Sequence, residues 1–209
     1  MRRLVLLLTM VAGAAFVAPA VAQAPTITMT ISRLSGGASG SVATVNYGRL
    51  VELSGDVSGA PAGQPVEIVV SPYRGETTVE QVTTDATGEF SFTHRPFIRT
   101  SYIARAGGGT STQEPLAFVR PTVRLTRLNR PKGWFAVRVN ADAQHVSHVV
   151  WFQRRINRTR WLTVKRVHLS RTLTARFRAR LPRGARWVRA VTPQTPGYLR
   201  ATSAFVRVR

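Results

Sequence analysis

Hydrophobic and polar residues alternate in short runs along most of the chain. From about residue 26 onward these runs recur roughly every ten residues, and Gly, Pro, Asp and Ser separate them. Alternation with a period of two is typical of β-strands that bury one face, and regularly spaced turn residues are typical of β-sandwiches. After the first 22 residues, no segment has the apolar spacing of an amphipathic helix. The pattern therefore predicts an all-β fold.

Two copies of a seven-stranded unit account for this pattern. In the first copy we expect strands at Ile27–Leu34, Leu50–Val57, Pro65–Val70, Thr77–Thr84, Glu89–His94, Ser101–Ala106 and Leu116–Val119. In the second copy we expect strands at Thr122–Leu128, Trp134–Asn140, His148–Arg154, Trp161–His168, Leu173–Leu181, Arg186–Thr192 and Ala204–Val208. Seven short strands in roughly 90 residues suit one β-sandwich in each copy.

The two copies also share residues in the same order. Ala117–Arg120 and Ala204–Arg207 have the same sequence, 87 positions apart, and Phe90 and Phe177 have the same offset. Other matches, such as Val66 with Val150 and Ile68 with Phe152, have an offset of 84. Matches in a common order at similar offsets indicate an internal repeat. We therefore expect one domain at residues 23–119 and another at 120–209, joined at Arg120-Pro121.

The first 22 residues have the features of an export signal. Arg2 and Arg3 precede an apolar run from Leu4 to Val17, and the segment ends in Ala20-Val21-Ala22. This order of positive, apolar and small residues is typical of a secretory signal peptide. We expect cleavage after Ala22 and export of the remaining chain, with no further transmembrane segment. An uncleaved membrane anchor is the alternative.

Several segments resemble a known family of extracellular domains. Thr84–Phe92 is similar to the T-D-x-x-G-x-F-x-F hairpin of bacterial immunoglobulin-like and carboxypeptidase-regulatory-like domains, and Thr100–Ala106 resembles the strand that follows it. In the second copy the similar segments are Phe152–Arg155, Trp161, Leu181–Gly184, Val188–Ala190 and Pro196–Leu199. The resemblance implies two consecutive immunoglobulin-like β-sandwiches of a secreted or surface protein. It implies no particular ligand, because such domains serve mainly as spacer, adhesion and display modules.

Charge divides the chain into two unlike halves. Residues 23–119 carry six arginines against eight carboxylates, whereas residues 120–209 carry 20 arginines and two lysines against Asp142 alone. The formal net charge of the whole chain is +21. A compositional bias toward arginine would raise the arginine content of both halves equally. The asymmetry therefore favours a polyanion-binding surface on the second domain.

Strand alternation assigns a row of arginines to one sheet of the second domain. In the run 174–181, Phe177 and its apolar neighbours face the core, so Arg176, Arg178 and Arg180 line the outer face. In the strand 134–140 the same rule places Arg138 and Trp134 outside. Immunoglobulin-like topology would put Arg138 and the arginine row in one sheet. The alternative role is a solvated charged edge that prevents aggregation between strands.

Aromatic residues and arginines are expected to mix on the other sheet. When Val150, Phe152, Val188 and Ala190 are buried, the outward residues are Trp151, Trp187, Phe205, Arg189, Arg207 and Arg209. Aromatic rings stack on sugars or bases, while guanidinium groups bind phosphate, sulfate or carboxylate. The alternative is a one-residue shift in register, which would move the tryptophans into the core.

Catalytic and metal-binding motifs are not found. The chain has no cysteine, which excludes disulfides, thiol nucleophiles and thiolate metal sites. Asp142 has no carboxylate partner in the basic half, and His145 and His148 would point to opposite faces of a strand. Asp85–Gly88 is typical of a turn rather than a calcium loop. We therefore expect a non-enzymatic protein with no metal, cofactor or small-molecule substrate.

Three functions are compatible with the sequence. The favoured one is a secreted or envelope-associated protein whose second domain binds a polyanion, such as a cell-wall polymer, an acidic polysaccharide or lipid head groups. The first alternative is a structural or display module without a defined ligand. The second alternative is an extracellular nucleic-acid-binding protein, for which a basic domain with exposed aromatic rings is also suited.

Overall fold

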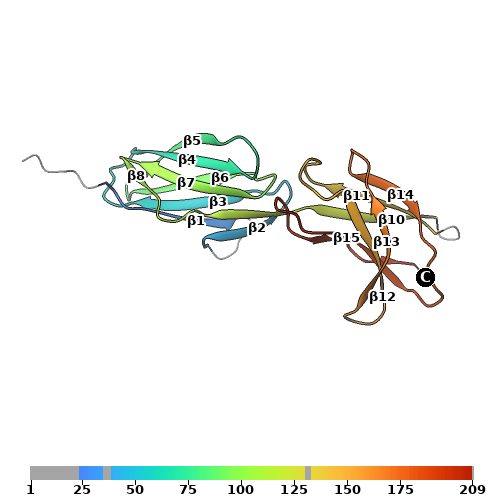
Figure 1. The fold of residues 1–209 in the computed structure, drawn as a ribbon. Helices are drawn as coiled ribbons and strands as arrows, with labels where there is room; N and C mark the ends of the chain where they lie inside the picture. The colour runs from blue at the N-terminus through green and yellow to red at the C-terminus, as the bar shows by residue number, and fades with distance from the viewer. Residues whose placement is uncertain (1–23, 35–38, 130–132, 209) are drawn as a thin grey trace, which may run out of the picture.

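The computed structural model describes residues 24–34, 39–129 and 133–208 of the chain. Within these residues the chain forms strands and turns without any helix, so the predicted all-β class is confirmed. The strands build an elongated molecule of two lobes that follow one another along its length (Figure 1). The predicted signal peptide, residues 1–22, lies outside the described residues. In the described part of the chain, no helix is long and apolar enough to cross a membrane.

Seventeen strands are present in the described residues. The first lobe contains β1 (Ile27–Arg33), β2 (Val42–Asn46), β3 (Val51–Val57), β4 (Pro65–Pro72), β5 (Thr78–Thr83), β6 (Glu89–His94), β7 (Thr100–Ala106), β8 (Gly109–Thr110) and β9 (Leu116–Arg120). The second lobe contains β10 (Thr122–Asn129), β11 (Trp134–Asn140), β12 (Val149–Arg155), β13 (Trp161–His168), β14 (Thr174–Arg178), β15 (Trp187–Thr192), β16 (Ala201–Thr202) and β17 (Val206–Arg207).

Each lobe is built from two sheets, and the strand order repeats from one lobe to the next. The first lobe has a three-stranded sheet, β1-β3-β6, and a larger sheet, β2-β9-β7-β4-β5, with β8 paired to β7. The second lobe has a three-stranded sheet, β10-β11-β14, and a larger sheet, β13-β12-β15-β16, with β17 paired to β15. Among the described residues, no sheet takes strands from both sides of Pro121. The fold is therefore a tandem repeat, as the shared residues predict.

The buried side chains follow the predicted alternation. In the first lobe, Ile27, Met29 and Leu53 of the smaller sheet and Ile68 and Tyr102 of the larger sheet are completely buried. These side chains occupy the inner faces of the two sheets and form the apolar core of the lobe.

Three phenylalanines form the centre of the second core. Phe135 and Phe177 come from neighbouring strands of the smaller sheet, and Phe152 comes from the larger sheet. Their ring centroids are 4.8 to 5.8 Å apart, within the range of favourable aromatic contacts. Because these rings come from both sheets, they hold the two layers of the lobe together.

The structure differs from the predicted strands in several places. It adds β2, which runs parallel to β9 in a Gly- and Ser-rich region where no strand was expected. The segment expected as a strand at 173–181 ends at Arg178, and the last strand covers only Val206–Arg207. His145 and His148 lie between β11 and β12 rather than on a strand, so the strand-based argument about them is wrong. Strand β2 is stabilised by pairing with the distant β9, and the two-residue strands β16 and β17 are stabilised by pairing with β15. Such pairing is not visible in the local sequence of these short segments.

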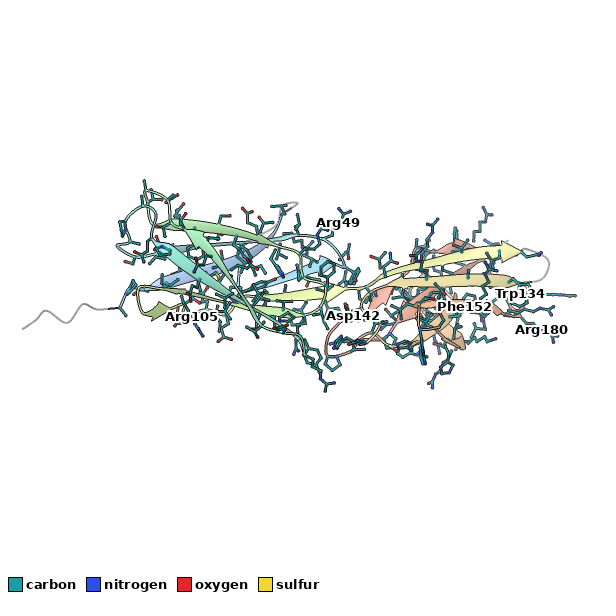
Figure 2. All side chains as sticks on the ribbon, turned by 90° about the horizontal axis from the view of Figure 1, so that it is seen from above. Arg49, Arg105, Trp134, Asp142, Phe152 and Arg180 are labelled. Atoms are coloured by element: carbon teal, nitrogen blue, oxygen red, sulfur yellow. The ribbon has the colours of Figure 1, made fainter. Side chains whose placement is uncertain are left out.

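The two lobes are joined in two places. The first is the short connection between β9 and β10, where Pro121 is the only intervening residue. Segment 193–200 of the second lobe reaches the first lobe. The Arg99 N–H donates a hydrogen bond to the Gly197 carbonyl (3.0 Å), and the Leu199 N–H donates one to the Val119 carbonyl (3.0 Å). Figure 2 shows Asp142 at this waist between the lobes. The sequence did not predict this second connection.

Candidate anion-binding surface

The larger sheet of the second lobe presents aromatic and arginine side chains on its outer face. Strands β12, β15 and β17 are neighbours in this sheet, as predicted. Val150, Phe152 and Val188 are at most 1% exposed on the inner face. Trp151 and Trp187 are half-buried on the opposite face, so the register shift that would place them in the core does not occur.

Arg189 lies at the centre of this outer face and is held in place from two sides. Its Nε donates a hydrogen bond to Oε1 of Gln153 (2.9 Å), and its guanidinium carbon lies 4.1 Å from the centre of the Trp161 ring. The Gln153 amide in turn donates to the hydroxyl of Thr163 (3.2 Å). Such a network orients the arginine before any ligand arrives, which lowers the entropic cost of binding.

The environment of Arg189 is partly desolvated. Burial, and then the positive charge of Arg200, lower the pKa of Arg189 below its ordinary value. An arginine has so high an ordinary pKa that the side chain remains charged at neutral pH. Reduced solvation would strengthen the attraction between Arg189 and a bound anion. The anion would also relieve the repulsion between Arg189 and Arg200.

Further aromatic rings extend this surface. The centroids of Trp161 and Phe205 are 5.1 Å apart, and the guanidinium of Arg200 lies 5.8 Å from the centre of the Trp151 ring. Phe205 is 54% exposed, and the exposed Arg207 lies opposite Trp187 in the strand register. We call this surface the aromatic–arginine face, and its members are Trp151, Trp161, Trp187, Phe205, Arg189, Arg200 and Arg207.

Sequence reasoning missed two members of the face, Trp161 and Arg200. Trp161 is opposite Arg155 across the β12–β13 hairpin, which closes through a hydrogen bond from the Ile156 N–H to the Arg160 carbonyl (2.9 Å). The short turn at 156–160 was the signal that could have paired these strands. Arg200 belongs to the segment that reaches the first lobe, and no local pattern predicts its position. Arg209, which was assigned to this surface, lies outside the described residues.

A basic hollow lies at one end of the face. It has a volume of about 410 Å³ and is lined by Trp187 and by arginines from two loops, including Arg158 and Arg186. Arg155 braces the first loop, because its guanidinium donates hydrogen bonds to the carbonyls of Asn157 (2.8 Å) and Arg158 (2.9 Å). The positive surface therefore continues from the sheet onto the hairpin tip.

The predicted arginine row lies on the smaller sheet of the second lobe. Arg138 of β11 is opposite Thr174 of β14, and Arg176 and Arg178 follow on the same outer face. Arg180 is also exposed but lies beyond the end of β14. Figure 2 shows Arg180 and Trp134 at the end of the second lobe that is remote from the first. The structure thus brings Arg138, Arg176 and Arg178 into one sheet and leaves Arg180 next to it.

Titratable groups that could act as acids or bases lie at the waist and in the first lobe. Burial would raise the pKa of Asp142, but hydrogen bonds from the Gln144 N–H and from His145 (2.9 Å) outweigh it and lower the pKa. Burial lowers the pKa of His94, although the charge of Glu80 opposes this. Within the described residues, no group of three or more Asp, Glu or His side chains could hold a metal ion.

Comparison with known proteins shows a distant structural likeness but no sequence relative. No known protein family matches the sequence, and no curated protein matches it. Among solved structures, the chain is similar to the crystal structure of a tetra-tandem repeat in the extending region of a large adhesion protein. The two share 13% sequence identity with a TM-score of 0.43, and the match covers 90% of this chain. The chain spans 50% of the length of that structure.

Proposed function

We propose that this chain is a non-enzymatic secreted or envelope-associated protein whose second lobe binds an acidic polymer. The observation that carries the proposal is the environment of Arg189, which is hydrogen-bonded to Gln153 and stacked against Trp161. Surface arginines that serve only for solubility need no such support. A guanidinium oriented beside exposed rings is suited to a ligand that has both an anionic group and a flat apolar surface.

An acidic polysaccharide meets both requirements. The flat faces of sugar rings stack on tryptophan, and the carboxylate or sulfate groups bind guanidinium. Residues 120–209 contain 20 arginines and only one carboxylate side chain, Asp142, which is engaged by His145. The lobe therefore offers little internal competition for an anionic ligand. Lipid head groups and nucleic acid also carry negative charge, but nucleic acid would stack bases rather than sugar rings on the aromatic side chains.

We also propose that residues 1–22 direct export and that each lobe is an immunoglobulin-like sandwich. The strand order supports the second proposal, because a three-stranded antiparallel sheet faces a larger sheet in both lobes. Strands β4 and β7 pair in the first lobe as β12 and β15 pair in the second. Sequencing the N-terminus of the exported protein tests the first proposal, which predicts that the mature chain begins at Gln23.

Binding to polygalacturonate tests the proposed ligand class. The Trp161→Ala variant removes the ring beside Arg189 and should weaken binding by about 1–3 kcal/mol if sugar rings stack there. Trp134→Ala is the matched control, since Trp134 is an exposed tryptophan (39%) on the other sheet. Affinity is measured by isothermal titration at several salt concentrations, with melting curves to verify folding. Equal affinity in the two variants would contradict the proposal.

A comparison of polymers separates the alternatives. The proposal expects polygalacturonate and heparin to lose more affinity with Trp161→Ala than polyphosphate, which has no rings and would lose only the support that Trp161 gives Arg189. A stronger effect on single-stranded DNA than on the polysaccharides would favour the nucleic-acid alternative. Equally steep salt dependence for every polymer, with no effect of the variant, would leave only a charged structural module.

A further inference from the structure

A second basic hollow lies on the outer face of the smaller sheet of the second lobe. Its volume is about 490 Å³, and strands β10, β11 and β14 all contribute to it. Three arginines, Arg124, Arg138 and Arg176, line it together with Thr126 and Thr174. This hollow is on a different sheet from the aromatic–arginine face.

The strand register brings the three arginines together. Arg124 is directly opposite Arg138, and Arg176 is opposite Ala136, two residues before Arg138 on the same strand. Adjacent strands are about 4.8 Å apart, so the flexible arginine side chains can reach a common point above the sheet. Like charges directly opposite each other destabilise a sheet. An anion bound between the arginines would attract each of them and offset this repulsion.

No carboxylate is available within these strands to neutralise the arginines. Strands β10, β11 and β14 contain neither aspartate nor glutamate. The small side chain of Ala136 occupies the centre of the hollow, between Thr126 on one strand and Arg176 on the other. A larger residue here would fill the space into which the guanidinium groups can turn.

We infer that this hollow binds one tetrahedral oxyanion, the phosphate or sulfate group of a charged polymer. Each guanidinium has a planar fork of donors that can bind two oxygens of such a group, and three forks can share its three or four oxygens. A carboxylate has only two oxygens and a single charge, so it would leave part of the hollow unpaired. The inference rests on the proposed function, because both require an anionic ligand.

Titration of the full chain with tripolyphosphate and with sulfate tests this inference. Arg138→Gln should weaken tripolyphosphate binding about tenfold, because it removes one charge-assisted contact. Arg183→Gln is the matched control, since it removes the same charge from an exposed loop outside the hollow. Ala136→Leu keeps every charge but fills the hollow, and it should weaken binding as much as Arg138→Gln. Melting curves verify that the variants are folded.

The outcomes separate this inference from the proposed function. Equal binding by Arg138→Gln and Arg183→Gln, or unchanged binding by Ala136→Leu, would overturn the hollow as a site. Should Ala136→Leu fail to fold, the two arginine variants still decide the question. Trp161→Ala should weaken polygalacturonate binding more than tripolyphosphate binding, whereas Arg138→Gln should weaken tripolyphosphate binding more than polygalacturonate binding. A higher affinity for inorganic phosphate than for sulfate, two tetrahedral anions of similar size and charge, would assign the hollow to phosphate groups, and the reverse order would assign it to sulfate esters.

Discussion

Tyr198 is one of the residues that join the two lobes. It is 2% exposed, and its hydroxyl donates a hydrogen bond to the Phe97 carbonyl of the first lobe (2.6 Å). The same hydroxyl accepts one from the Asp142 N–H (2.8 Å). Burial raises the pKa of Tyr198 still further above neutral pH, and the protonated hydroxyl is the donor to the Phe97 carbonyl. One side chain thus connects three segments that are distant in sequence.

The Tyr198→Phe variant should lower the free energy of unfolding by about 1–3 kcal/mol. The change removes only the hydroxyl and leaves two partly buried backbone groups, the Phe97 carbonyl and the Asp142 N–H, without their partner. Urea denaturation of the full chain measures the loss. Tyr73→Phe is the control, because Tyr73 contacts the waist through its ring, which packs against His145 and lies 4.7 Å from the guanidinium of Arg99. A similar effect in both variants would show that the Tyr198 hydroxyl contributes nothing specific.

Gly55 leaves space for a neighbouring aromatic ring inside the first lobe. A β-carbon at this position would lie 2.5 Å from the end of the Phe90 ring and even closer to the Thr28 carbonyl. Phe90 is opposite Gly55 in the strand register, so its ring occupies the space that the missing side chain leaves. This explains why a glycine is present in the middle of β3, where it otherwise weakens a strand.

We expect Gly55→Ala to lower the stability of the chain by roughly 1–3 kcal/mol, since overpacking forces neighbouring groups apart. The melting temperature measures the effect. Ser54→Ala, one residue earlier on the exposed face, is the control and should change stability by less than about 0.5 kcal/mol. If Gly55→Ala melted like the wild type, the ring of Phe90 would have to move without cost, and the packing argument would be wrong.

The charge of Asp142 makes the waist sensitive to acid. Hydrogen bonds lower the pKa of Asp142 below its ordinary value of 3.8, so the ionised side chain stabilises the fold above that pH. This contribution is lost as the pH falls through the lowered pKa. Asp142→Asn cannot titrate, so the stability difference between wild type and variant should shrink as the pH falls from 6 toward 3. A constant difference across this range would contradict the assignment.

At the scale of elements, strand alternation determines which side chains form the core and which form the surface. Phe152 and Trp151 are neighbours on β12, yet Phe152 packs against Phe135 and Phe177 while Trp151 lies beside Arg200 on the opposite face. The two residues therefore contribute differently to stability despite their similar size.

Alanine variants of these two residues test the assignment. Phe152→Ala should lower the free energy of unfolding by about 3–5 kcal/mol, because it leaves a cavity beside the rings of Phe135 and Phe177. Trp151→Ala should cost only about 1 kcal/mol, as is usual for a partly exposed position. Denaturant unfolding of the two variants gives both values. A loss of stability for Trp151→Ala as large as that for Phe152→Ala would mean that Trp151 belongs to the core.

At the scale of the whole molecule, corresponding sheets of the two lobes carry opposite charge. The outer face of β1-β3-β6 borders a hollow of about 540 Å³ with four carboxylates around it, Glu52, Asp56, Asp85 and Glu89. The equivalent sheet of the second lobe, β10-β11-β14, has arginines on its outer face. The repeat therefore preserves the strand order while the two surfaces have diverged in charge.

Separate expression of the two halves tests this division of roles. Residues 121–209 should bind heparin about as tightly as the full chain, with affinity that falls steeply as salt increases. Residues 23–120 should not bind measurably under the same conditions, because their carboxylates outnumber their arginines. Heparin chromatography of both fragments, after circular dichroism has verified that they are folded, gives the comparison. Equal retention of the two fragments would contradict it, and failure of either to fold would show that the waist is essential.

Features that depend on neighbouring residues along the chain could be predicted from the sequence. Alternation with a period of two is a local property of extended backbone, so it predicted that Phe135 and Phe177 are buried and that Arg138 and Arg176 are exposed. The turn at Asp85–Gly88 was predicted for the same reason. In the structure the Gly88 N–H donates to the Asp85 carbonyl (3.2 Å), and the Asp85 carboxylate accepts from the Thr87 N–H (2.8 Å).

Contacts between exposed residues of different strands depend on how the whole chain packs. The pairing of Arg124 with Arg138 depends on the register between β10 and β11, which is set by packing and not by either strand alone. Trp161 meets Arg189 across β12, whose pairing with β13 shifts between Phe152 and Gln153. Tyr198 reaches Phe97 over 101 positions of sequence. These contacts join segments far apart in the chain, and their geometry follows from how whole strands and loops pack, which no local pattern encodes.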